Sequence, residues 1–250
     1  MNKNLLKLNA FTLAEVLITL GIIGVVAAVT MPTLVKNYQK KQTVVQLKKA
    51  YTELYHAINI AQKDLGMIED WNIVDAQTFY EKVFKPNLKI IKYCAPSSNK
   101  CWADNSYSLK GIKYRTLNNE TAERNSFLTA SGYSVFYWLH GNFSGGWLFV
   151  DINGPQKPNI LGKDIFALTF RYGRTVSVSS PKLGLFPQGL QFAQSIPREN
   201  LLSGDYGEML SESNATVLGG CSSESNNRIG VTCAAIIMLD NWEIKDDYPW

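Results

Sequence analysis

The sequence opens with a long apolar segment whose charged residues are confined to its ends. No residue is charged from Val16 to Val35, a run of 20 positions, and Glu15 lies directly before that run. A helix rises about 1.5 Å per residue, so a helix of that length extends roughly 30 Å, which is the thickness of the hydrocarbon core of a bilayer. We therefore predict a membrane-spanning helix over residues 11–31.

The hydrophobic pattern continues beyond Pro32 with a helical period and ends at Gly66. It predicts one helix from Thr12 to Leu65 that bends near Pro32, because proline has no N–H and clashes with the preceding turn. The first half is apolar on all sides, whereas the second half is amphipathic and is expected to pack one stripe against a folded body. The apolar positions of the second half are Leu34, Val35, Tyr38, Val45, Leu47, Tyr51, Leu54, Tyr55, Ile58 and Leu65.

Beyond residue 66 the pattern changes to short runs. A weaker helical segment, Ala76–Phe84, is followed by Pro86, and several β-branched or aromatic runs come after it. These runs predict an antiparallel sheet of four or five strands, with residues 141–146 as a hairpin connection. The expected strands are Tyr107–Tyr114, Gly132–His140, Trp147–Ile152, Phe166–Phe170 and Thr175–Ser179.

The end of the chain is harder to assign from its pattern. Ser180–Asn227 contains three prolines and a cluster of serine, asparagine and glutamate, which predicts a loop-rich stretch. Val231–Trp242 is compatible with a helix or a strand, and its alanine-rich apolar run favours a helix.

Composition and charge narrow the class of protein. Of the 250 residues, 46% are hydrophobic and 18% are charged, which is typical of a folded chain and not of a disordered one. The net charge of +4 comes from lysines before the apolar segment and just after Pro32, so residues 67–250 are close to neutral. We therefore expect no nucleic-acid partner.

The first residues carry a more specific signal. A short basic leader, residues 1–10, ends in the small residue Ala10, Phe11 follows, and Glu15 is the fifth residue counted from Phe11. This arrangement resembles the amino terminus of type IV prepilins and type II secretion pseudopilins over about residues 3–55. The family usually has glycine where this chain has Ala10, and many members have a kink-forming proline where this chain has Pro32.

The resemblance implies how the segment is processed and used. A prepilin peptidase and N-methyltransferase would cut between Ala10 and Phe11 and methylate the new amino terminus. Glu15 would then pair with the Phe11 amine of a neighbouring subunit, because a carboxylate at the membrane edge is costly without a partner. Three alternatives stay open: a Glu15 that faces water, an anchor that is not cleaved, and an ordinary signal peptide.

The resemblance also implies an α+β, pilin-like fold, in which the long amino-terminal helix packs on an antiparallel sheet head. The chain would comprise a leader (1–10), a helix (11–66) and a head (67–250). It would cross the bacterial inner membrane once, keep its head outside the cytoplasm, and later enter a filament. Expected partners are other pilin or pseudopilin subunits, the peptidase and an assembly platform. The resemblance does not distinguish a secretion pseudopilus from a type IV pilus. The large head mildly favours a minor-pilin or pseudopilin role over that of the bulk subunit of a filament.

Four cysteines lie in the predicted head: Cys94, Cys101, Cys221 and Cys233. Three disulfide pairings are possible, and pairing of nearest neighbours is the most economical. Disulfides agree with an extracytoplasmic head. The alternatives are free thiols and a zinc site, although neither pair has the C-x2–4-C spacing typical of zinc ligands.

One loop contains candidate metal ligands. Asp151, Asn153 and Asp164 lie in a glycine- and proline-rich stretch, and their side-chain oxygens are suited to calcium, which some secretion pseudopilins bind in a late loop. The simpler interpretation, which we favour, is a turn after a strand, in which Asn153 and Gly154 provide the left-handed conformation.

Catalytic motifs are lacking. The chain has only two histidines, His56 and His140, and no nucleophile elbow, P-loop or H-E-x-x-H motif. We therefore expect a structural subunit and not an enzyme. The alternative is a single-pass membrane-anchored enzyme or a binding or adhesin domain outside the cytoplasm.

Overall fold

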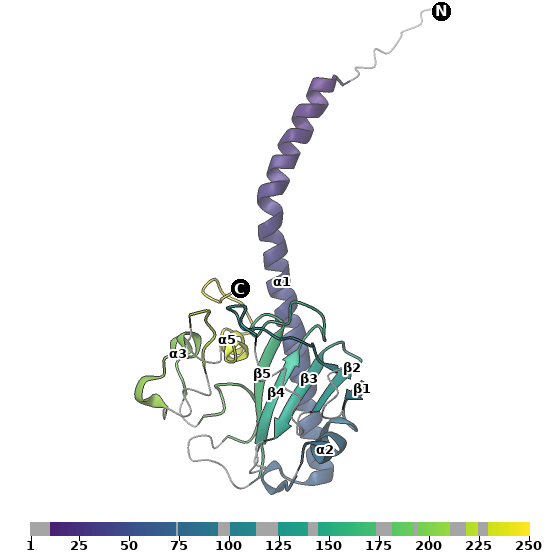
Figure 1. Cartoon of the computed structure of the whole chain (residues 1–250), viewed down its shortest axis with the longest axis vertical. Helices are drawn as coiled ribbons and strands as arrows, with labels where there is room; N and C mark the ends of the chain where they lie inside the picture. The colour runs from purple at the N-terminus through teal and green to yellow at the C-terminus, as the bar shows by residue number, and fades with distance from the viewer. Residues whose placement is uncertain are drawn as a thin grey trace, which may run out of the picture. The chain divides into compact units, whose positions relative to one another are not determined.

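The computed structural model describes residues 11–73, 75–94, 101–113, 125–139, 145–173, 182–192, 195–210, 219–224 and 230–250. The chain divides into two units, Met1–Lys41 and Gln42–Trp250. Helix α1 (Leu13–Leu65) begins in the first unit and ends in the second, which agrees with the predicted helix over Thr12–Leu65. Figure 1 shows α1 and the strands that belong to the second unit.

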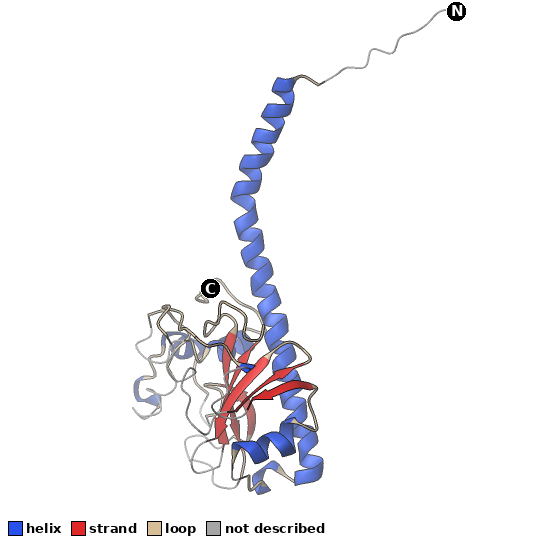
Figure 2. Cartoon of the chain, turned by 45° about the vertical axis from the view of Figure 1, so that its right-hand side comes forward, coloured by secondary structure: helices blue, strands red, loops and turns tan. Residues whose placement is uncertain are grey.

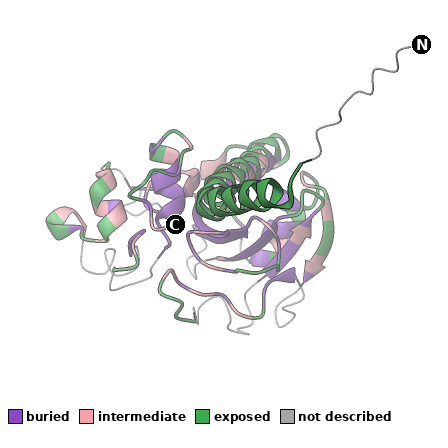
Figure 3. Cartoon of the chain, turned by 90° about the horizontal axis from the view of Figure 1, so that it is seen from above, coloured by how far each residue is buried: buried purple, intermediate pink, exposed green. Residues whose placement is uncertain are grey.

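The first unit consists of the amino-terminal part of α1. Its apolar side chains are exposed on every side, and Figure 3 shows this part of the helix in the colour of exposed residues. By length and composition this helix is able to cross a membrane. Pro32 lies inside the helix without ending it. Because proline has no N–H, the carbonyl of Ala28 lacks its usual intrahelical donor.

Helix α1 ends where the sequence predicts. Gly66 adopts a left-handed backbone with φ of 78°, and its N–H donates to the Gln62 carbonyl over 3.0 Å. This conformation is accessible to glycine without steric cost and ends the helix. The Trp71 indole N–H donates to the Gly66 carbonyl over 2.9 Å, so the chain turns back at once.

The head, Gln42–Trp250, is built on a six-stranded sheet in which each strand pairs antiparallel with the next along the chain. Figure 2 shows the strands together in red. This up-and-down order needs only short connections. The strands are β1 (Ile90–Cys94), β2 (Asn125–Thr129), β3 (Ser134–Leu139), β4 (Gly145–Asp151), β5 (Ile165–Arg171) and β6 (Gly184–Pro187).

Both faces of the central strands are buried. Alternate residues such as Tyr137, Leu148 and Phe166 belong to the main core, which also contains a stripe of α1 residues. The opposite face carries Phe136 and Phe149 in a second apolar cluster. The stripe of α1 follows helical spacing and consists of Leu47, Ala50, Leu54, Ala57, Ile58 and Ala61.

Short helical elements complete the described part of the head. The predicted helical segment before Pro86 forms α2 (Ala76–Phe79) and a π-turn, η2 (Tyr80–Phe84), and the Asp75 side chain caps α2 by accepting from the Thr78 N–H over 2.7 Å. Val231–Trp242 contains the predicted helix, α5 (Cys233–Leu239). The remaining elements are η1 (Ile68–Asp70), α3 (Arg198–Ser203) and η5 (Gly207–Met209).

The strand prediction was only partly correct. Tyr107–Tyr114 is not a strand over its described residues: Gly111 has φ of 75° and makes a tight turn, which leaves Tyr107 in isolated bridges. Strands β1, β2 and β6 were not predicted, and β6, α3 and η5 fall within the predicted loop Ser180–Asn227. Thr175–Ser179, His140 and residues 141–144 lie outside the described residues.

Candidate functional site: the amino-terminal helix and a cleft in the head

The exposed apolar helix is the first candidate site. Phe11 is 87% exposed, and every apolar side chain of α1 from Leu13 to Val35 is exposed except for one half-buried alanine. Such a surface is stable when lipid or neighbouring apolar helices cover it, because in water it would remain unfavourably hydrated. Ala10, the other residue of the predicted processing site, lies outside the described residues.

Glu15 has a local role that the sequence analysis overlooked. The Thr12 N–H donates to Glu15 Oε2 over 2.8 Å, and the Glu15 N–H donates to the Thr12 hydroxyl oxygen over 3.2 Å. The Thr12 hydroxyl also donates to Oε2, over 2.7 Å. These reciprocal bonds form a capping box, which fixes the start of the helix directly after Phe11. The spacing of threonine and glutamate three residues apart is a known signal for it.

The capping box leaves part of the carboxylate available. All three contacts of Glu15 with Thr12 use Oε2 or the backbone, and no contact to Oε1 occurs within residues 11–73 of the described chain. The cap and an intermolecular partner are therefore compatible, since a carboxylate has two oxygens that accept hydrogen bonds.

The four cysteines form two disulfides in the head. Cys94, at the end of β1, pairs with Cys101, and Cys221 pairs with Cys233 at the start of α5. This is the nearest-neighbour pairing that the sequence favours. The cysteines are thus covalently engaged, which agrees with an oxidising environment for the head.

The loop between β4 and β5 brings Asp151, Asn153 and Asp164 together. Asp164 accepts the N–H of Asn159 over 2.7 Å and the N–H of Ile160 over 2.6 Å, one on each carboxylate oxygen. Asp151 accepts the Asn153 N–H over 3.3 Å. Burial, and next the charge of Asp164, raises the pKa of Asp151 to about 9, so this carboxyl is protonated at neutral pH.

These contacts fit a hydrogen-bonded turn and do not fit a calcium site. With its amide nitrogen turned toward Asp151, Asn159 donates to Asp151 Oδ2 over 3.2 Å. Among the described residues the buried Asn153 Oδ1 has no hydrogen-bond partner, but one amide oxygen beside two engaged carboxyl groups does not provide the six or more oxygens of calcium. Among the described residues no group of three or more acidic, histidine or cysteine side chains is placed to hold a metal. Gly154, with φ of 70°, supplies the turn.

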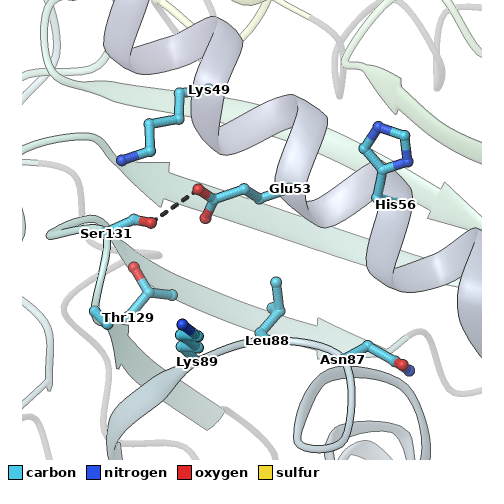
Figure 4. Close-up of a pocket in the computed structure, with 9 residues that line it drawn as sticks. Lys49, Glu53, His56, Asn87, Leu88, Lys89, Thr129 and Ser131 are labelled. Carbon is cyan, nitrogen blue, oxygen red and sulfur yellow. Dashed lines mark hydrogen bonds between the residues drawn. The ribbon is translucent and has the colours of Figure 1, made fainter.

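A cleft of about 450 Å³ opens between the carboxyl-terminal part of α1 and the β1–β3 end of the sheet. Helix α1 contributes Lys49, Glu53 and His56, and the other wall includes Lys89 and Ser131 (Figure 4). The Ser131 hydroxyl donates to Glu53 Oε1 over 2.8 Å. No ion pair involves Lys49 or Lys89 within the described ranges, which leaves their ammonium groups available.

No pattern in the sequence predicts this cleft. Its residues come from three segments that are far apart along the chain, and most of them are polar or charged types that are common on protein surfaces. From the sequence, His56 is expected to be a surface or packing residue of the helix, and the structure puts it at the cleft wall. The Tyr133 hydroxyl is buried, and the charge of Glu53 acts on it. Burial, and then the charge of Glu53, raises the pKa of this phenol.

No protein-family model, curated protein or solved structure matches this chain.

Proposed function

We propose that this protein is a pilin-like structural subunit that assembles through its amino-terminal helix into a type II secretion pseudopilus or a type IV pilus. The observation that carries the proposal is the exposed apolar part of α1 with a single carboxylate, Glu15, in its first turn. Before assembly, membrane lipid would surround the apolar helix, and in the filament the identical helices of neighbouring subunits would cover it. The protein would catalyse no reaction.

The start of the helix supports this use of Glu15. The capping box starts at Thr12, directly after Phe11, and α1 begins at Leu13, so removal of residues 1–10 would leave the helix and its cap intact. A new amine on Phe11 would then lie four residues before a carboxylate whose Oε1 still accepts hydrogen bonds. In an apolar environment the amine of a neighbouring subunit would relieve the cost of that charge, and would set the axial position of the two helices.

The first test is the amino terminus of the protein extracted from membranes. We expect a mass and an amino-terminal sequence that begin at N-methylated Phe11. A chain that retains residues 1–10 in cells with the peptidase would contradict the proposal. It would instead favour a membrane-anchored enzyme or binding domain.

The second test separates the charge of Glu15 from its capping role. Glu15→Gln retains a side chain that is able to close the capping box but removes the charge, whereas Thr12→Ala removes the cap and retains the carboxylate. We expect Glu15→Gln to insert and be processed normally but to lose filaments. Thr12→Ala should still assemble. Normal filaments from Glu15→Gln would show that Glu15 acts only as a cap, and would contradict the proposed pairing.

A further inference from the structure

Two regions of the head, near opposite edges of the sheet, carry opposite charge. At the β1 edge, residues 80–94 contain four lysines and a single glutamate, and one of these lysines, Lys89, lines the cleft opposite Lys49. Helices α3 and α5 lie near the other edge, where α5 contacts β5 and β6. Figure 1 shows α3 and α5 on one side of the sheet and β1 and β2 on the other. The four lysines are Lys82, Lys85, Lys89 and Lys92.

The acidic side is the segment from α3 to η5. Glu199, Asp205 and Glu208 are all exposed, and Arg198 is the only basic residue between residues 198 and 210. Arg198 is already engaged, because its guanidinium donates to Asp240 over 2.7 Å and to Asp247 over 2.6 Å. No ion pair involves Glu199 or Glu208 within the described part of the chain, so this segment presents uncompensated carboxylates.

Because the basic and acidic regions are separated in this way, we infer that the cleft lined by Lys49 and Lys89 receives the acidic α3–η5 segment of a second copy of this chain. The inference rests on the proposed filament and assigns a contact between heads within it. Donor and acceptor surfaces lie at opposite edges of one sheet, so the contact is heterologous. Each copy keeps one surface free for the next, and such contacts build open assemblies and not closed dimers.

The chemistry of the cleft suits carboxylates on a protein surface. Two ammonium groups face a single carboxylate, Glu53, which is already bound by the Ser131 hydroxyl. Docking of Glu199 and Glu208 would balance the lysines. Exposed ion pairs contribute little affinity individually, so the apolar helices would hold the filament while this contact selects the rotation between neighbouring heads.

Zero-length carbodiimide cross-linking of the full-length protein tests the contact directly. We expect assembled wild-type filaments to yield peptides that join Lys49 or Lys89 of one copy to Glu199 or Glu208 of another. Unassembled protein in membranes should not yield them. Filaments whose cross-links join neither lysine to this segment would overturn the inference.

Charge reversal provides the functional test. Lys49→Glu with Lys89→Glu should reduce filament yield at least about tenfold, since two attractive pairs become repulsive. Adding Glu199→Lys and Glu208→Lys to the same chain should restore assembly. The matched control is Lys110→Glu with Lys113→Glu, which changes the net charge equally on exposed residues outside both surfaces and should leave yield unchanged. Disulfide content and tryptophan fluorescence would verify that each head is folded.

The outcomes separate the inference from the proposed function. Normal assembly of the cleft variant, or loss of assembly that the compensating changes do not restore, would overturn the assigned contact and leave the filament proposal intact. The second of these results would point to a different anionic occupant of the cleft. Wild-type protein that is processed but never assembles with its machinery present would contradict the proposed function itself.

Discussion

The two halves of helix α1 share one continuous backbone but have opposite surroundings. From Gln42 to Leu65 the helix buries a narrow stripe that includes Leu54, which is fully buried in the head core. From Leu13 to Lys41 it buries no side chain, and Val25 is 67% exposed. The head explains why the second half is amphipathic. Within the described residues the apolar side chains of the first half stay exposed, so this apolar sequence is adapted to something outside the chain.

The largest expected effect tests the buried half. Leu54→Ala should lower the free energy of unfolding of the head by about 2–5 kcal/mol, because it removes buried methyl groups and leaves a cavity. Leu34→Ala, at a position that is 65% exposed, should change it by less than about 0.5 kcal/mol. All six tryptophans lie in the head, so tryptophan fluorescence during denaturant unfolding in detergent measures this domain alone. Equal losses for both variants would contradict the comparison.

A matched pair of valines tests what covers the exposed half. Val25 and Val45 are 67% and 66% exposed, so lysine at either site is equally accommodated by the isolated chain. If lipid covers only the first half, Val25→Lys should make membrane insertion less favourable by about 3 kcal/mol.

Val45→Lys should leave insertion unchanged. A calibrated insertion assay on the full chain measures both variants. Indifference to lysine at residue 25 would mean that lipid does not surround this segment, and would remove the main support for a membrane-spanning helix.

The smallest expected effect concerns the first turn of α1. Thr12→Ala should destabilise the start of the helix by about 1 kcal/mol, because it removes one partner of the capping box. Thr30→Ala is the control, since the Thr30 hydroxyl only donates to the Val26 carbonyl within the helix, over 2.9 Å. Amide hydrogen exchange should speed up roughly fivefold over the first turn in Thr12→Ala and stay unchanged there in Thr30→Ala. Equal protection in both variants would show that the capping box contributes nothing.

Long periodic patterns were predicted well. The helix over residues 13–65, its end at Gly66 and the central strands β3, β4 and β5 all lie within or beside the predicted ranges. Each of these elements has enough apolar residues at a regular spacing for its local pattern to identify it. The two disulfides have the nearest-neighbour pairing that was the most economical of the three possible ones.

The missed strands are short and depend on neighbours. Strand β6 spans only Gly184–Pro187 and contains two residues that disfavour strands, which is tolerated because it lies at the edge of the sheet. Strand β2 begins with Asn125 and Ser126, both buried although polar. Conversely, Tyr107–Tyr114 has the composition of a strand but lacks a flanking strand to pair with over its described residues.

The sequence by itself determined that an apolar helix with one carboxylate in its first turn precedes an α+β head that contains four cysteines. Those features depend on residues close together in the chain, so local spacing and composition are sufficient to identify them. Only the tertiary structure decided that Asp151 is protonated in a hydrogen-bonded turn, that Lys49 and Lys89 line one cleft, and that a basic and an acidic region lie near opposite edges of the sheet. These properties arise from distant segments, because burial and charge act through space and not along the chain.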